Sequence, residues 1–81
     1  MELVRLIRQI DERECARRNA LTNKPVGFAL MVGAIGTVVE RFGSGEELLV
    51  EFGSRGEDQC DWLGVLKASE LELLAEVAQA A

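Results

Sequence analysis

Apolar and polar residues alternate along two short segments in the middle of the chain, and a glycine-containing turn joins them. The first segment, Thr37–Phe42, opens with β-branched residues, which favour extended backbone. The second, Leu48–Phe52, places its large apolar residues on one face of a strand and Glu51 on the other. Gly43 and Gly45 can adopt positive φ in the connection. These features together predict an antiparallel hairpin.

The first ten residues fit two secondary structures. Their apolar residues recur at the spacing of one helix face: Leu3, Leu6, Ile7 and Ile10. The same residues also suit a strand that is covered on both sides. Periodicity alone favours the helix, which would then run from Glu2 to about Asn19.

The segment Asp11–Asn19 is predicted to be helical under either interpretation. Asp11 can cap the helix N-terminus, with Glu14 three positions further on. Arg17 and Arg18 lie near the other end, where positive charge complements the helix dipole. The chain then breaks from the helical pattern before its single proline, Pro25.

The apolar run Val26–Val32 contains no charged residue. It is either a buried strand or a contact surface for another copy or another protein, and both readings stay open. Aromatic and methionine side chains are enriched at protein interfaces. The sole tryptophan belongs either to the core or to an interface. The interface candidates are therefore Phe28, Leu30, Met31 and Trp62.

The C-terminal third follows a polar loop over Gly53–Asp61. Trp62–Ala68 is predicted to be a strand. Ser69–Glu72 has the spacing of a helix-capping box. A short turn followed by a final strand, Leu71–Leu74, is expected next, with a short helical element at the C-terminus because the tail is rich in helix-forming residues.

Three stretches resemble a known family: VGAIGTVVERF, EELLVEF and WLGVLKASELELL. They are similar to the small bacterial domains designated domain of unknown function 4926. The resemblance implies one SH3-like β-barrel over residues 1–81, mainly β, with about five antiparallel strands. In that case Leu3–Ile10 is the first strand and a helix starts near Asp11, within an enlarged first loop, Glu12–Met31. Similar GxxGTVV runs occur in other SH3-like barrels, including the accessory subunit of nitrile hydratase.

Composition adds a prediction about association. The chain has 81 residues, enough for one small domain, and 48% of them are hydrophobic. A chain this short buries only about 60–65% of its unfolded surface. The hydrophobic surplus therefore predicts a homo-oligomer or a complex with another protein.

Charge argues against a nucleic-acid partner. The net charge is −5, and residues 42–81 hold nine acidic residues against two basic ones. Binding to phosphates needs clustered lysine and arginine. Only Arg13, Arg17 and Arg18 form a weak patch of possible anion contacts, so a nucleic-acid-binding barrel is kept as an alternative.

The sequence offers little catalytic chemistry. It contains no histidine, which removes the usual general base and the common zinc ligand sets. Its glycines match neither phosphate-binding fingerprint, because no lysine follows them and Glu46 and Glu47 would repel a phosphate. Cys15 and Cys60 are best explained as unpaired thiols, and Cys60 lies between acidic residues that oppose ionisation. The acidic residues of its loop, Glu57, Asp58 and Asp61, match no calcium-loop spacing. No catalytic, cofactor or metal site is predicted.

The N-terminus lacks the apolar core of a signal peptide. The longest nearly uncharged stretch, about 15 residues from Pro25 to Val39, is too short to span a bilayer. We therefore expect a cytoplasmic protein with no membrane contact. The function expected is that of a non-catalytic protein-interaction module, a small bacterial accessory or regulatory protein that self-associates. An accessory subunit of a larger enzyme is the other alternative.

Overall fold

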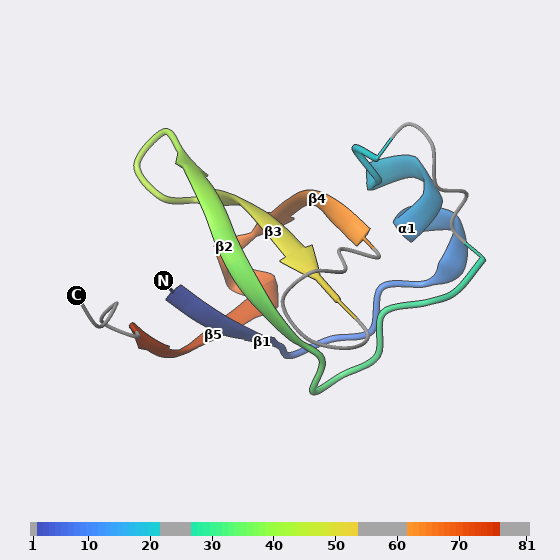
Figure 1. Ribbon diagram of the computed structural model, residues 1–81, viewed down its shortest axis with the longest axis horizontal. Coiled ribbons are helices and arrows are strands. Elements are labelled where there is room, and N and C mark those ends of the chain that lie inside the picture. The colour runs from blue at the N-terminus through green and yellow to red at the C-terminus, as the bar shows by residue number, and fades with distance from the viewer. Residues whose placement is uncertain (1, 22–26, 54–61, 77–81) are drawn as a thin grey trace.

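The computed structural model describes residues 2–21, 27–53 and 62–76, and its strands form one antiparallel sheet. Figure 1 shows this sheet curling on itself, with the single described α-helix beside the start of β4. The strand order is β4-β3-β2-β1-β5. This mainly β arrangement of five strands confirms the predicted fold class. The elements are β1 Glu2–Leu6, α1 Glu12–Arg18, β2 Ile35–Phe42, β3 Glu47–Phe52, β4 Trp62–Lys67, the 3-10 turn η1 Ala68–Glu70, and β5 Leu71–Glu76.

The N-terminal segment is a strand, as the family resemblance implied, and the prediction of one helix from Glu2 to Asn19 is wrong. β1 pairs with β2 on one side and β5 on the other. Val4 and Leu6 point into the core and are buried, whereas Ile7 is 49% exposed. Pairing on both edges satisfies the backbone groups of β1, and this tertiary gain outweighs the local helical periodicity.

The helix begins where the sequence predicts. The Asp11 carboxylate caps α1 by accepting a hydrogen bond from the Glu14 N–H at 2.9 Å. After the helix, the chain joins the outer edge of β4 through a bridge between Asn19 and Gly64 and a 2.6 Å hydrogen bond from the Ala20 N–H. This segment therefore covers part of an edge strand that would otherwise expose unpaired backbone.

The hairpin of β2 and β3 confirms the clearest prediction from the sequence. Gly43 and Gly45 adopt φ values of 58° and 91° in the turn. Leu48, Val50 and Phe52 of β3 face the core, as their alternation predicts. The pairing of β2 with β3 shifts register between Val38 and Glu40, so β2 contains one extra residue at this point, Val39.

The apolar run that ends at Val32 does not form a strand in its described part, which starts at Gly27. Leu30 makes an isolated bridge to Ile10, with two backbone hydrogen bonds of 2.9 Å. The chain then turns, and Gly33 adopts a φ of 95°. This turn interrupts the ladder between the bridge and β2, so the reading of a continuous buried strand is wrong.

The C-terminal part corrects the predicted capping box. Ser69 lies inside η1, and the turn is held by the Glu70 carboxylate, which accepts a hydrogen bond from the Lys67 N–H at 2.9 Å. β5 follows and extends to Glu76, two residues further than predicted. The helical tail expected beyond it lies outside the described residues.

The core lies between the sheet and α1. Its buried side chains come from β1, β3, β4, the helix and the segments between β1 and β2: Val4, Leu6, Ile10, Cys15, Leu30, Leu48, Val50, Phe52, Trp62 and Leu66. Ala34, Val38 and Leu71 pack against it from positions that are partly exposed.

Gly64 is predicted to tolerate no side chain. A Cβ at this position would lie 2.5 Å from the Arg18 carbonyl oxygen and 2.6 Å from the Trp62 ring. We expect Gly64→Ala to lower the free energy of unfolding by about 1–3 kcal/mol, as overpacking does in other cores. Urea unfolding followed by circular dichroism measures this. Gly27→Ala is the matched control, because its Cβ would meet nothing within 4 Å, and an equal effect of the two substitutions would contradict the packing shown by the structure.

Candidate functional site

A group of exposed apolar side chains lies where β1 ends and β2 begins, and we call it the apolar tip. Its members are 49–62% exposed: Ile7, Met31, Val32 and Ile35. Leu6 hydrogen-bonds to both Gly33 and Ala34, which brings the end of β1 against the turn before β2. Ile35 pairs with Arg5, so Ile7 is its diagonal neighbour on the outer face of the sheet. The apolar tip is therefore assembled from two segments.

The four interface candidates from the sequence divide into two exposed and two buried residues. Phe28 is 38% exposed and Met31 is 58% exposed. Leu30 and Trp62 are only 6% and 0% exposed, so a partner cannot reach them while the barrel is closed. Sequence reasoning missed Ile7 and Ile35 as members of a surface, whereas Val32 belongs to the apolar run for which a contact surface was one of two readings. Only pairing of β1 with β2 brings Ile7 close to residues 31–35, and no local pattern encodes that contact.

Trp62 is a core residue with a long-range hydrogen bond. Its indole Nε1–H donates to the Cys15 carbonyl oxygen at 2.8 Å, which ties β4 to α1. Its ring packs at a tilt on Phe52, with 5.8 Å between the ring centroids. The side chain is therefore part of the core and does not line a ligand groove.

The possible anion contacts of α1 are largely committed to carboxylates. Arg17 donates to Glu14 at 2.9 Å through its Nε. Arg18 donates to Glu14 at 3.1 Å and to Glu70 at 3.0 Å. Arg13 is exposed. A phosphate could engage Arg17 or Arg18 only by replacing these ion pairs.

Glu70 is the buried centre of a polar cluster that joins η1, α1 and the end of β1. It is 3% exposed, and its Oε1 accepts hydrogen bonds from the Lys67 N–H and from the Arg18 guanidinium. The Arg8 guanidinium lies 3.5 Å from the other carboxylate oxygen, Oε2. The buried charge is therefore both paired and hydrogen-bonded, which is the condition under which a buried carboxylate is tolerated.

The charges of this cluster shift two pKa values downward. Burial by itself raises the pKa of Glu70, but the Lys67 N–H and the Arg18 guanidinium outweigh it, and the net shift is downward. The hydrogen bond from Arg17 lowers the pKa of the Glu14 carboxyl to about 2. Both carboxylates are thus ionised at neutral pH and serve to hold α1 in place.

Cys15 has the features of a packed thiol. It is fully buried, and its Sγ–H donates to the Ile10 carbonyl oxygen at 3.3 Å. Burial raises the pKa of the thiol, which opposes the thiolate form that a nucleophile needs. Cys60 lies outside the described residues, as does its acidic loop with Glu57, Asp58 and Asp61.

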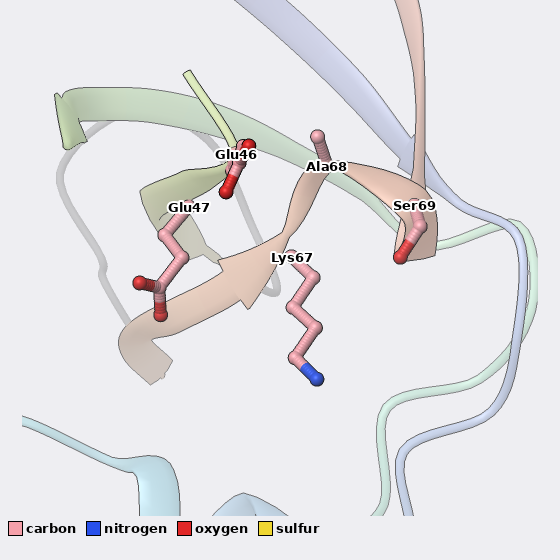
Figure 2. Close-up of a pocket in the computed structure, with 5 residues that line it drawn as sticks. All are labelled: Glu46, Glu47, Lys67, Ala68 and Ser69. Atoms are coloured by element: carbon pink, nitrogen blue, oxygen red, sulfur yellow. The ribbon is translucent and has the colours of Figure 1, made fainter. Parts of the chain in front are cut away.

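One shallow pocket of about 500 Å³ lies between the start of β3 and η1 (Figure 2). Its lining is mostly polar: Glu46, Glu47, Lys67, Ala68 and Ser69. A backbone hydrogen bond of 2.8 Å from the Ala68 N–H to the Glu46 carbonyl joins the two segments that line the pocket. Glu47 and Lys67 are directly opposite on neighbouring strands, yet Figure 2 shows their charged ends turned apart, and no ion pair joins them. The pocket thus offers charged groups that can contact a bound molecule.

The described part of the chain, residues 2–21, 27–53 and 62–76, holds no group of three or more His, Cys, Asp or Glu side chains placed to bind a metal ion. Among the same residues, no helix has the length and apolar character needed to cross a membrane. The described surfaces that a partner can reach include the apolar tip, the pocket and the outer face of the sheet.

Comparison with known proteins leaves the family open. The chain matches no protein-family model, no curated protein and no solved structure.

Proposed function

We propose that the protein is a non-catalytic protein-interaction module that self-associates through the apolar tip. The observation that carries this proposal is the exposure of four large aliphatic side chains, Ile7, Met31, Val32 and Ile35, on adjoining segments of so small a chain. Adjoining exposed apolar residues of this kind are a common mark of interaction sites.

A second copy is a suitable occupant of the apolar tip for an energetic reason. Fully burying one aliphatic side chain contributes about 1.5–3 kcal/mol, so a half-exposed one offers roughly half of that. One apolar tip alone offers roughly 3–6 kcal/mol on this basis, which is close to the ~4–15 kcal/mol that association itself costs. A twofold dimer buries the same patch on both subunits and so doubles the contribution.

The charges around the apolar tip also suit a protein contact. Arg5 lies 3.5 Å from Glu72, and Arg8 lies 3.5 Å from Glu70. The arginines that border the patch are therefore already paired within one chain. A partner that covers the apolar tip therefore does not bury Arg5 or Arg8 as an unpaired charge, which limits the desolvation cost.

Substitution of Val32 tests the apolar tip. Val32 is 62% exposed, so Val32→Lys leaves the core intact and places a charge inside the proposed interface. We expect the wild type to sediment as a dimer at equilibrium and the variant as a monomer. Val39→Lys is the matched control, because Val39 is 53% exposed on β2 but lies outside the apolar tip. If both variants keep the wild-type mass, or both lose it, the apolar tip is not the interface.

The finer parts of the proposal rest on the resemblance stated above. On that resemblance, the protein is a small bacterial accessory or regulatory protein of the cytoplasm, in the family of domain of unknown function 4926. The five antiparallel strands of one sheet support only the mainly β fold that the resemblance implies. Copurification with a larger enzyme from the host would support the alternative role of an accessory subunit.

A further inference from the structure

The outer face of β2, β3 and β4 carries a second set of apolar residues. Burial along β3 and β4 alternates, so their odd-numbered residues point away from the core. Leu49 lies directly opposite Val65, and both are only partly buried. Phe42, which is 38% exposed, is the diagonal neighbour of Leu49. We call the resulting diagonal row the outer strip; its residues are Phe42, Leu49, Val65 and Leu63.

Carboxylates lie opposite residues of the outer strip in both strand pairs, β2–β3 and β3–β4. Glu47 lies opposite Phe42, Glu40 lies opposite Leu49, and Glu51 lies opposite Leu63. None of the three forms an ion pair with another described residue. Four other glutamates differ, because an arginine pairs with each of them: Glu2, Glu14, Glu70 and Glu72. The outer strip is thus an apolar row bordered by three carboxylates that form no ion pair with a described residue, although Lys67 lies opposite Glu47 on the neighbouring strand.

We propose that the outer strip binds a cationic amphipathic segment of another protein, in which apolar residues alternate or recur with lysine or arginine. Apolar side chains of that segment would cover the outer strip, and its cations would pair with Glu40, Glu47 and Glu51. The pocket beside Glu47 is also lined by Glu46, which adds a carboxylate, and by Lys67, whose charged end is turned away from Glu47. A second copy fits this face poorly, because the chain carries a net charge of −5.

This proposal does not depend on self-association, because it uses a different face of the molecule. The probe is a short fluorescently labelled peptide of alternating lysine and leucine, titrated with the protein and followed by anisotropy at low salt. A peptide of alternating glutamate and leucine serves as the charge-reversed control. We expect the cationic peptide to bind, the acidic peptide not to bind, and the affinity to fall steeply as salt is added.

Two variants and one control locate the binding surface. Glu40→Gln is expected to weaken binding roughly threefold, as loss of one partly exposed ion pair does. Phe42→Ser is expected to weaken it roughly tenfold by removing an apolar contact. Glu12→Gln, an exposed site on α1, removes the same charge elsewhere and is expected to leave binding unchanged.

Three outcomes would overturn the proposal. The cationic peptide could fail to bind at low salt, or the acidic peptide could bind equally well. Glu12→Gln could weaken binding as much as Glu40→Gln, which would show attraction by overall charge alone. Glu40→Gln alters an exposed residue, so its result can be interpreted even if Phe42→Ser proves too unstable to purify.

Discussion

Replacement of Trp62 by alanine is expected to remove a large part of the protein's folding stability. The tryptophan is fully buried, and loss of a large buried aromatic ring costs about 3–5 kcal/mol. A domain of 81 residues has a total stability of roughly 4–12 kcal/mol, so this loss takes from about a quarter to all of it. Trp62→Phe keeps most of the packing but removes the hydrogen bond to Cys15. We expect it to lower the free energy of unfolding by about 1–2 kcal/mol.

Urea unfolding followed by far-ultraviolet circular dichroism measures both variants without relying on the tryptophan signal. Met31→Ala is the control, since Met31 is 58% exposed and surface truncations usually change stability by less than about 0.5 kcal/mol. A Trp62→Ala protein as stable as the Met31→Ala protein would show that Trp62 does not hold β4 to α1.

Replacement of Glu70 by glutamine is expected to cause the second large loss of stability. Glutamine keeps the shape of the side chain but removes the charge that Arg18 and the Lys67 N–H contact. Hydrogen bonds to charged groups contribute about 1.5–3 kcal/mol, and we expect a loss of stability in that range. Glu72→Gln is the matched control, because the Arg5–Glu72 pair is half exposed at 3.5 Å and such pairs contribute about 0–1 kcal/mol.

The same site predicts how stability depends on pH. The pKa of Glu70 is lower in the folded state than the ordinary value of 4.5, so its contribution is fully present above about pH 4.5. It is lost as the pH falls through the folded-state pKa, because the protonated carboxyl binds Arg18 more weakly. The pKa of Glu14, lowered to about 2, adds a loss of the same sign between about pH 4.5 and pH 2. Unfolding free energies measured from neutral pH down to strongly acidic pH should fall for the wild type and fall less for Glu70→Gln. A wild-type profile that is flat below pH 4.5 would contradict this role for Glu70.

Local patterns predicted the elements whose stability depends on near neighbours. The β2–β3 hairpin needs only alternation and turn glycines, and both are plain in the sequence. The start of α1 needs only Asp11 as a cap. Both features appear where they were expected, with small differences in their ends.

The remaining features depend on contacts between distant residues. Residues 2–10 have a helical period, yet β1 forms because β2 and β5 flank it, and neither partner can be identified from the segment itself. Ile10 meets Leu30, and Trp62 meets Cys15 across 47 positions in sequence. The burial of Leu30 and Trp62, and so their loss as interface candidates, follows from these contacts.

The outer strip also could not be predicted from the sequence alone. Phe42, Leu49 and Val65 come from three strands, and only the register of β2, β3 and β4 places them in one row. The sequence revealed the excess of negative charge in residues 42–81 but not which carboxylates would lack an arginine. Glu70 appeared there as one acidic residue among many, although the fold buries it and makes it a structural centre.

The native mass of the wild-type protein tests self-association most directly. Light scattering on a sizing column, over a wide range of protein concentrations and with reductant present, gives this mass without a model of shape. We expect a mass of twice the 8.9 kDa of one chain at high concentration, falling toward one chain on dilution. A mass near 8.9 kDa at every concentration would contradict the proposal that the apolar tip joins two copies.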